Sequence, residues 1–74
     1  MTAVELRELF GGRWDGGGRE IHGLIDHGGR RLKVELLRGA QWCCSVFDGG
    51  NCVASSAEAK PEMAVRAALA ALKT

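Results

Sequence analysis

Apolar and polar residues alternate in three segments in the middle of the chain, at positions 19–26, 30–39 and 40–50. Successive side chains of a strand point to opposite faces of a sheet, so each segment predicts a β-strand with one apolar face. The residues predicted to face the core are Ile21, Gly23, Ile25, Leu32, Val34, Leu36, Trp42, Cys44 and Val46. The opposite face would carry Glu20, His22, Leu24, Asp26, Arg31, Lys33, Glu35, Leu37, Cys43, Ser45 and Phe47.

Glycine-rich segments separate these strands. "HGG" at 27–29 and "DGGN" at 48–51 predict tight turns, because glycine adopts positive φ at no steric cost. Residues 52–55 can return as a short fourth strand at the sheet edge. Residues 12–20 read as a loop, since three consecutive glycines, Gly16 to Gly18, carry no side chain that would hold one path.

Both ends of the chain predict helices. In residues 2–12, Thr2 has capping-box spacing to Glu5, and Gly11 with Gly12 ends the helix. Its apolar contacts are expected from Val4, Leu6, Leu9 and Phe10, with the tightest stripe at the last three. Residues 55–74 predict the second helix, with Pro61 suited to a first turn and Lys73 placed favourably for the helix dipole. Its apolar stripe would be Val65, Ala68, Leu69 and Leu72.

The predicted fold class is therefore α+β, in the order α-β-β-β(-β)-α, with an antiparallel meander sheet and a helix packed on it at each end. The 74 residues form a single domain, 1–74, whose small core gives modest stability. The pattern leaves open whether the first helix covers the second face of the sheet. The protein would have three layers if that helix covers the second face, and two layers if it does not.

Composition narrows the class of protein. Apolar residues make up 46% of the chain, and 10 Lys and Arg balance 9 Asp and Glu for a net charge of +1. This balance favours neither a mimic of nucleic acid nor a protein that holds phosphates by bulk charge. No apolar run is long enough to cross a bilayer, and "MTAVELRELF" lacks the features of a signal peptide. We expect a cytoplasmic protein without a membrane partner.

Cys43, Cys44 and Cys52 are the residues most suggestive of chemistry. Adjacent cysteines on a strand point to opposite faces, so Cys43 and Cys44 do not form a chelating pair, and no metal is expected. A catalytic thiol would need a nearby base such as His22. We interpret Cys44 as a core residue and Cys43 as a half-buried residue of the sheet. No acid pair or catalytic triad is present in the sequence, so we expect neither an enzyme nor a cofactor.

Two groups of residues are candidates for binding. The first combines the basic residues of the first half with one aromatic residue, and comprises Arg13, Trp14, Arg19, Arg30, Arg31, Lys33 and Arg38. These charges predict either a solvated mixed-charge face or a patch that contacts phosphates. Trp14 is either a lid over the core or a binding anchor. The second group would form an apolar partner patch if left uncovered, and comprises Leu24, Leu37 and Phe47.

The second half of the chain, residues 41–72, resembles the C-terminal part of the phage ABA sandwich domain, a family of small phage and prophage proteins. The resemblance begins with a Trp-x-x-x-Val strand, Trp42 to Val46, and a Gly-rich turn. A helix motif similar to the family's A-P-x-A-I-x-R-A-A-L follows, matched at Pro61, Arg66, Ala67, Ala68 and Leu69. In the first half, two strands and a Gly-rich loop stand where that family would have a long central helix. The resemblance implies a phage origin.

The predicted order of elements is also similar to that of the double-stranded RNA-binding domain, which ends in an alanine-rich helix. That family carries a lysine cluster at the start of the last helix, whereas this chain has Lys60 alone, next to Pro61 and Glu62. RNA binding of that kind depends on phosphate contacts. Here it would require Arg30, Arg31, Lys33 and Lys60 to converge on one face.

These observations lead to one expected function and two alternatives. We expect a phage- or prophage-encoded binding protein in the cytoplasm of a bacterial host cell, where it inhibits a host defence complex by protein–protein contact, as anti-CRISPR proteins do. The first alternative is a nucleic-acid-binding module. The second is a virion or structural accessory protein that oligomerises, for example as a homodimer, through the sheet edge at residues 52–55.

Overall fold

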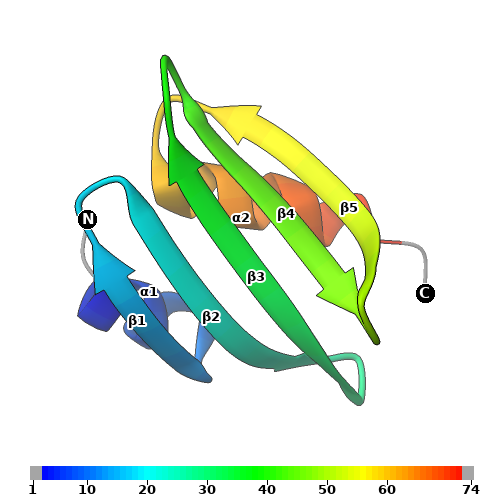
Figure 1. The fold of residues 1–74 in the computed structure, drawn as a ribbon. Helices are drawn as coiled ribbons and strands as arrows, with labels where there is room; N and C mark the ends of the chain where they lie inside the picture. The colour runs from blue at the N-terminus through cyan, green and yellow to red at the C-terminus, as the bar shows by residue number, and fades with distance from the viewer. Residues whose placement is uncertain (1–2, 73–74) are drawn as a thin grey trace.

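The computed structural model describes residues 3–72, which form two helices and one sheet (Figure 1). The elements in chain order are α1 (Ala3–Phe10), β1 (Arg13–Gly17), β2 (Glu20–His27), β3 (Arg30–Arg38), β4 (Trp42–Asp48), β5 (Asn51–Glu58) and α2 (Pro61–Ala70). The strands pair in chain order as a five-stranded antiparallel meander. The expected α+β order, with a helix at each end, is confirmed. The predicted roles of Thr2 and Lys73 lie outside the described residues.

Tight hairpins set the register of the sheet. Gly28 and Gly29 join β2 to β3, Gly49 and Gly50 join β4 to β5, and all four have positive φ. Positive φ at both central residues matches the right-handed twist of the flanking strands. Both predicted turns are therefore confirmed.

Both helices lie on the same face of the sheet, behind the strands in Figure 1. Helix α1 packs near β1, and α2 packs across β4 and β5. Between the helices and the sheet lies one core, whose buried members are Leu6, Ile21, Ile25, Leu32, Val34, Leu36, Trp42, Cys44, Val46, Ala64, Val65 and Ala68. The predicted inward positions of the three middle strands are confirmed. The protein has two layers, so the helices leave the second sheet face uncovered.

The prediction of a loop over residues 12–20 is wrong, because residues 13–17 form β1. The glycines are part of the strand and its turn. Gly16 has a φ of +97°, and a Cβ atom there would lie 2.5 Å from the carbonyl oxygen of Glu20. The strand is held by its pairing with β2, which a side-chain pattern in residues 13–17 does not reveal.

The second helix begins later than predicted, at Pro61 instead of residue 55, and β5 extends to Glu58. Lys60 has an extended backbone, with φ −125° and ψ 144°. The ring of a proline disfavours the helical conformation of the residue before it, so the helix starts at the proline itself. The predicted edge strand at 52–55 therefore continues for three more residues.

Helix α1 contributes less to the core than its apolar residues predict. Leu6 is fully buried, but Val4 is 61% exposed and Leu9 is 51% exposed, so the core contacts predicted for these two residues are wrong. Phe10 is partly buried; its ring lies 6.3 Å from that of Trp14, and the guanidinium of Arg66 on α2 lies 6.0 Å from it. In an eight-residue helix only a narrow stripe reaches the sheet. Neither helix is long and apolar enough to cross a membrane, as far as residues 3–72 show.

Candidate binding face

Within residues 3–72, no helix covers the other side of the sheet, here called the open face (Figure 1). Its side chains form three rows that run across the strands from β1 to β5. The first row contains Arg13, Leu24, Lys33, Phe47 and Cys52. The second row contains Asp15, His22, Glu35, Ser45 and Ser55. The third row contains Gly17, Glu20, Leu37, Cys43 and Ala57.

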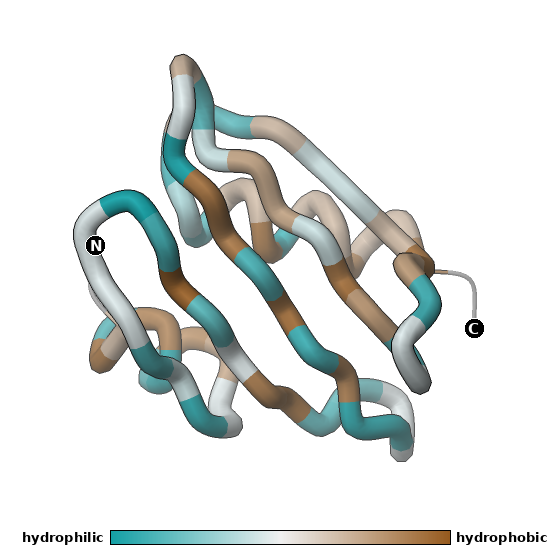
Figure 2. The backbone as a smooth tube through the Cα atoms, in the orientation of Figure 1, coloured by the Kyte–Doolittle hydropathy of each residue, from teal (hydrophilic) through white to brown (hydrophobic). Residues whose placement is uncertain are grey.

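The predicted apolar residues all lie on this face, but not as one patch. Leu24 and Phe47 flank Lys33 in the first row, and Leu37 lies two rows away beside Cys43. Leu24 is 43% exposed and Leu37 is 53% exposed, while Phe47 is half-buried. The aliphatic part of Lys33 can join Leu24 to Phe47, because a lysine stem packs on apolar neighbours while its ammonium stays in water. The hydropathy colouring in Figure 2 shows brown and teal residues alternating along these strands.

Charged side chains on the open face pair with one another. Arg31 Nε lies 3.4 Å from Asp26 Oδ1, and Lys33 Nζ lies 3.5 Å from Glu35 Oε1. His22 lies between two carboxylates, with Nε2 3.0 Å from Glu20 Oε1 and Nδ1 3.8 Å from Glu35 Oε1. Exposed pairs of this kind contribute only about 0–1 kcal/mol each to stability. Their consequence is a surface of mixed sign, on which Arg31 and Lys33 already have acidic neighbours.

The predicted basic residues do not converge on one surface. Arg13, Arg31 and Lys33 lie on the open face. Arg30 and Arg38 occupy positions of the helix-covered face by the alternation of β3. Arg19 lies in the β1–β2 turn, where its carbonyl oxygen accepts a hydrogen bond from the Arg38 backbone N–H at 2.8 Å. Lys60 precedes α2. The convergence of Arg30, Arg31, Lys33 and Lys60 that phosphate binding would require is therefore absent from the described structure.

Trp14 is a lid over the core. It pairs with Gly23 on the helix-covered face, where its ring occupies the space that a side chain at position 23 would fill. Its Nε1–H donates a hydrogen bond of 2.8 Å to the carbonyl oxygen of Gly11. Because the ring and its polar atom are both engaged within the fold, Trp14 is not presented as an anchor for a partner. The sequence left both roles open, and the register decides between them.

The three cysteines have different surroundings and are all free thiols. Cys44 is buried, as predicted, and burial raises the pKa of its thiol from 9.0 to about 12, with a smaller electrostatic contribution from Cys52. Cys43 is exposed on the open face, so the prediction that it is half-buried is wrong. Residues 3–72 contain no cluster of three or more His, Cys, Asp or Glu side chains that could bind a metal ion.

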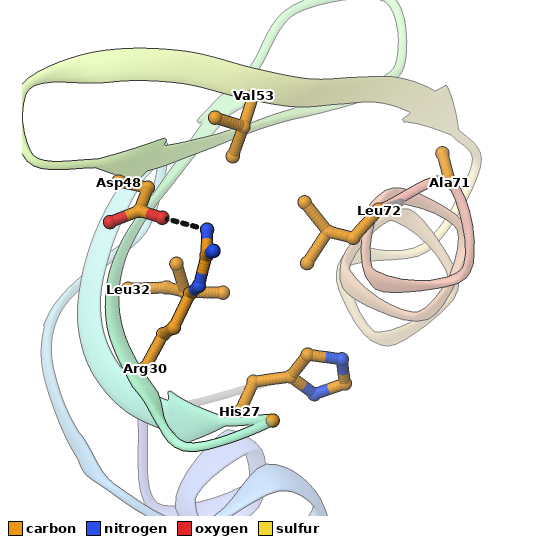
Figure 3. Close-up of a pocket in the computed structure, with 8 residues that line it drawn as sticks. His27, Arg30, Leu32, Asp48, Val53, Ala71 and Leu72 are labelled. Carbon is orange, nitrogen blue, oxygen red and sulfur yellow. Dashed lines mark hydrogen bonds and ion pairs between the residues drawn. The ribbon is translucent and has the colours of Figure 1, made fainter. Parts of the chain in front are cut away.

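A cavity of about 490 Å³ lies beside the C-terminal end of α2 and was not anticipated from the sequence. Leu32, Val53 and Leu72 contribute apolar side chains to its lining, and the Arg30 guanidinium lies 2.8 Å from the Asp48 carboxylate (Figure 3). These residues come from β3, β4, β5 and the segment that follows α2, and no local pattern connects them. Arg30 and Asp48 form an ion pair with each other. Neither side chain therefore offers an unpaired charge to a ligand in this cavity.

Comparisons with protein-family models, with curated proteins and with solved structures find no match for this chain.

Proposed function

We propose that this protein is a non-enzymatic binding protein that contacts a partner protein through the open face of its sheet. The observation that carries the proposal is the set of exposed apolar side chains, Leu24 and Leu37 with the half-buried Phe47, on a face without a covering element. Protein interfaces combine apolar contacts with a polar rim, and isolated charges are unfavourable at their centre. The paired charges of the open face suit such a contact.

In its most specific form, the proposal is a phage- or prophage-encoded inhibitor of a host defence complex, of the anti-CRISPR type. The phage origin rests on the resemblance of residues 41–72 to the phage ABA sandwich domain. The mechanism would be occupation of a surface that the complex needs for its own assembly or substrate. Such a mechanism requires a stable scaffold and an accessible face, and no catalytic group.

The arrangement of basic residues favours a protein partner over nucleic acid. Affinity for nucleic acid depends on several unpaired cations that contact phosphates together. On the open face, Arg31 and Lys33 each have a carboxylate within 3.5 Å. The test described below distinguishes the proposal from the nucleic-acid-binding alternative by the effect of nuclease.

A pull-down with matched variants tests the proposal. Leu37→Asn would remove an exposed apolar side chain from the open face, and Leu9→Asn would make the same change on α1, where Leu9 has nearly the same exposure of 51% against 53%. Tagged wild-type protein would be incubated with a lysate of a bacterial host, with and without nuclease, and retained proteins identified by mass spectrometry.

We expect a stoichiometric complex that survives nuclease, persists with Leu9→Asn and is lost with Leu37→Asn at unchanged thermal stability. Retention of nucleic acid alone, removed by nuclease, would refute the proposal and favour the alternative. Equal loss in both variants would show that the open face is not the contact. Recovery of subunits of a defence complex, with loss of its activity on adding the protein, tests the inhibitor form.

A further inference from the structure

Strand β5, Asn51–Glu58, forms one edge of the sheet, and in the described residues it has a neighbour, β4, on one side only. An edge strand carries a row of backbone N–H and C=O groups without strand partners, and proteins protect such edges with Lys, Pro, short strands or bulges. Residues 51–58 contain no Lys, Arg or Pro, and their only charged residue is Glu58. The bulge between Val46 and Phe47 disturbs one end, but residues 54–58 pair regularly with β4.

The opposite edge differs in each of these respects. Strand β1 has five residues, of which Arg13 and Asp15 are charged and Gly16 and Gly17 lack side chains. The φ of +97° at Gly16 departs from extended backbone, so the outer side of β1 is a poor template for another strand. One edge of this sheet is therefore protected, and the other is open to pairing.

Helix α2 packs on β5 and leaves one of its own flanks exposed. The Ser56 hydroxyl donates a hydrogen bond to the carbonyl oxygen of Ala64, which fixes this side of α2 over the strand. Met63, Ala67 and Ala71 are exposed and follow one another at steps of four residues, so they share one flank of the helix. Two of these three side chains are methyl groups, and Met63 and Val53 add exposed apolar area of 45% and 44% of their surfaces.

We propose that β5 pairs with β5 of a second copy of this chain, antiparallel across a two-fold axis at Ser55. A two-fold contact pairs the β5 edges of both copies at once and gives a closed dimer. Pairing of β5 with β1 of the next copy would instead form a chain of copies without a defined end. Around this axis Ala54 of one copy lies opposite Ser56 of the other, and the two Glu58 side chains lie at opposite ends of the paired segment. A parallel pairing would place the two Glu58 side chains side by side, and like charges opposite each other are destabilising.

The dimer would join two sheets into one and make the two open faces continuous. It does not depend on the proposed function, because it uses the edge of the sheet and leaves the open face accessible. Backbone hydrogen bonds and a narrow strip of side chains bury less surface than a permanent dimer needs, so the association is reversible and depends on concentration.

Sedimentation equilibrium over a wide concentration range tests the proposal. We expect the mass of the wild type to rise from 7.9 kDa toward twice that value. Ser55→Lys places two like charges opposite each other at the axis and should weaken the dimer by up to about fivefold. Gly17→Lys adds the same charge at the opposite edge, where φ is not positive and a Cβ atom has no neighbour within 4 Å, and should not change the association.

Amide hydrogen exchange locates the contact independently of the variants. In the dimer, amides of β5 should exchange more slowly than in the monomer, and those of β1 should not. A monomer at all concentrations would overturn the proposal, as would a dimer unaffected by Ser55→Lys. A dimer that is lost with Leu37→Asn but persists with Ser55→Lys would assign self-association to the open face instead of the edge.

Discussion

The packing of Trp14 on Gly23 makes a prediction that can be tested quantitatively. A Cβ atom added at position 23 would lie 2.5 Å from Trp14 Cε3 and 2.7 Å from both Cδ2 and Cζ3. Carbon atoms in contact lie about 3.5–4.0 Å apart, so the indole would have to move by about 1 Å. The movement also strains the 2.8 Å hydrogen bond from Trp14 Nε1–H to the Gly11 carbonyl oxygen. Gly23→Ala should therefore destabilise the protein.

Three contributions set the size of the effect. Overpacking costs about 1–3 kcal/mol, and weakening a neutral hydrogen bond costs about 1 kcal/mol. Replacing glycine by alanine within a strand regains about 0.5–1 kcal/mol, because alanine loses less backbone entropy on folding. The net destabilisation by Gly23→Ala is about 2 kcal/mol. Small domains of this length have a total stability of roughly 4–11 kcal/mol, so the change would be readily measured.

A double-mutant cycle gives the decisive assay. In a Trp14→Ala background the space above position 23 is empty, so Gly23→Ala should change sign and stabilise the protein by about 0.5–1 kcal/mol. Urea unfolding followed by far-ultraviolet circular dichroism suits all variants, because it does not depend on tryptophan fluorescence. Gly17→Ala is the matched control, since nothing lies within 4 Å of its added Cβ. Equal destabilisation by Gly23→Ala in both backgrounds would refute the assignment of Trp14 as a lid.

Two further predictions concern single sites. The thiol of Cys44 ionises at a pKa of about 12 in the folded protein but near 9.0 when unfolded, so ionisation favours unfolding and stability falls as pH rises from 9 toward 12. Urea titrations of wild type and Cys44→Ala across this range should show the additional fall only in the wild type, and identical pH slopes would contradict the buried thiol. Gly12→Ala places a Cβ atom 2.1 Å from the Leu24 carbonyl oxygen at a φ of +77°, whereas Gly11→Ala has a similar φ of +71° and open space. Thermal unfolding should show a larger loss for Gly12→Ala, and equal losses would show that backbone strain alone sets the cost.

Much of the architecture could be predicted because apolar and polar residues alternate along the strands. The inward residues of β2, β3 and β4 follow a period of two. The β2–β3 and β4–β5 turns each contain two consecutive glycines with positive φ. Strand β1 escaped prediction because Gly16 and Gly17 carry no side-chain pattern and take their conformation from pairing with β2. The length of β5 escaped because Ser and Ala at 54–57 suit a strand or the approach to a helix equally.

The candidate site was predictable in part for the same reason. Alternation correctly placed Leu24, Leu37 and Phe47 on one face, but it did not say whether a helix covers that face. That outcome depends on where α1 packs, and only Leu6 of that helix is fully buried. Closeness in sequence does not place the basic residues on one surface. Arg30 and Arg31 are adjacent in the chain and therefore lie on opposite faces of the sheet.

Residues of the same strand are under different constraints, because some pack in the core and others lie on the open face. Along β3, Leu32, Val34 and Leu36 are fixed by the packing of the core, while Arg31, Lys33 and Leu37 contact mainly solvent. A substitution on the second set leaves the core intact, so its cost to stability is usually within about 0.5 kcal/mol. Alternate positions of one strand can therefore change at different rates. A protein built this way can acquire a new partner surface residue by residue while the fold beneath it stays the same.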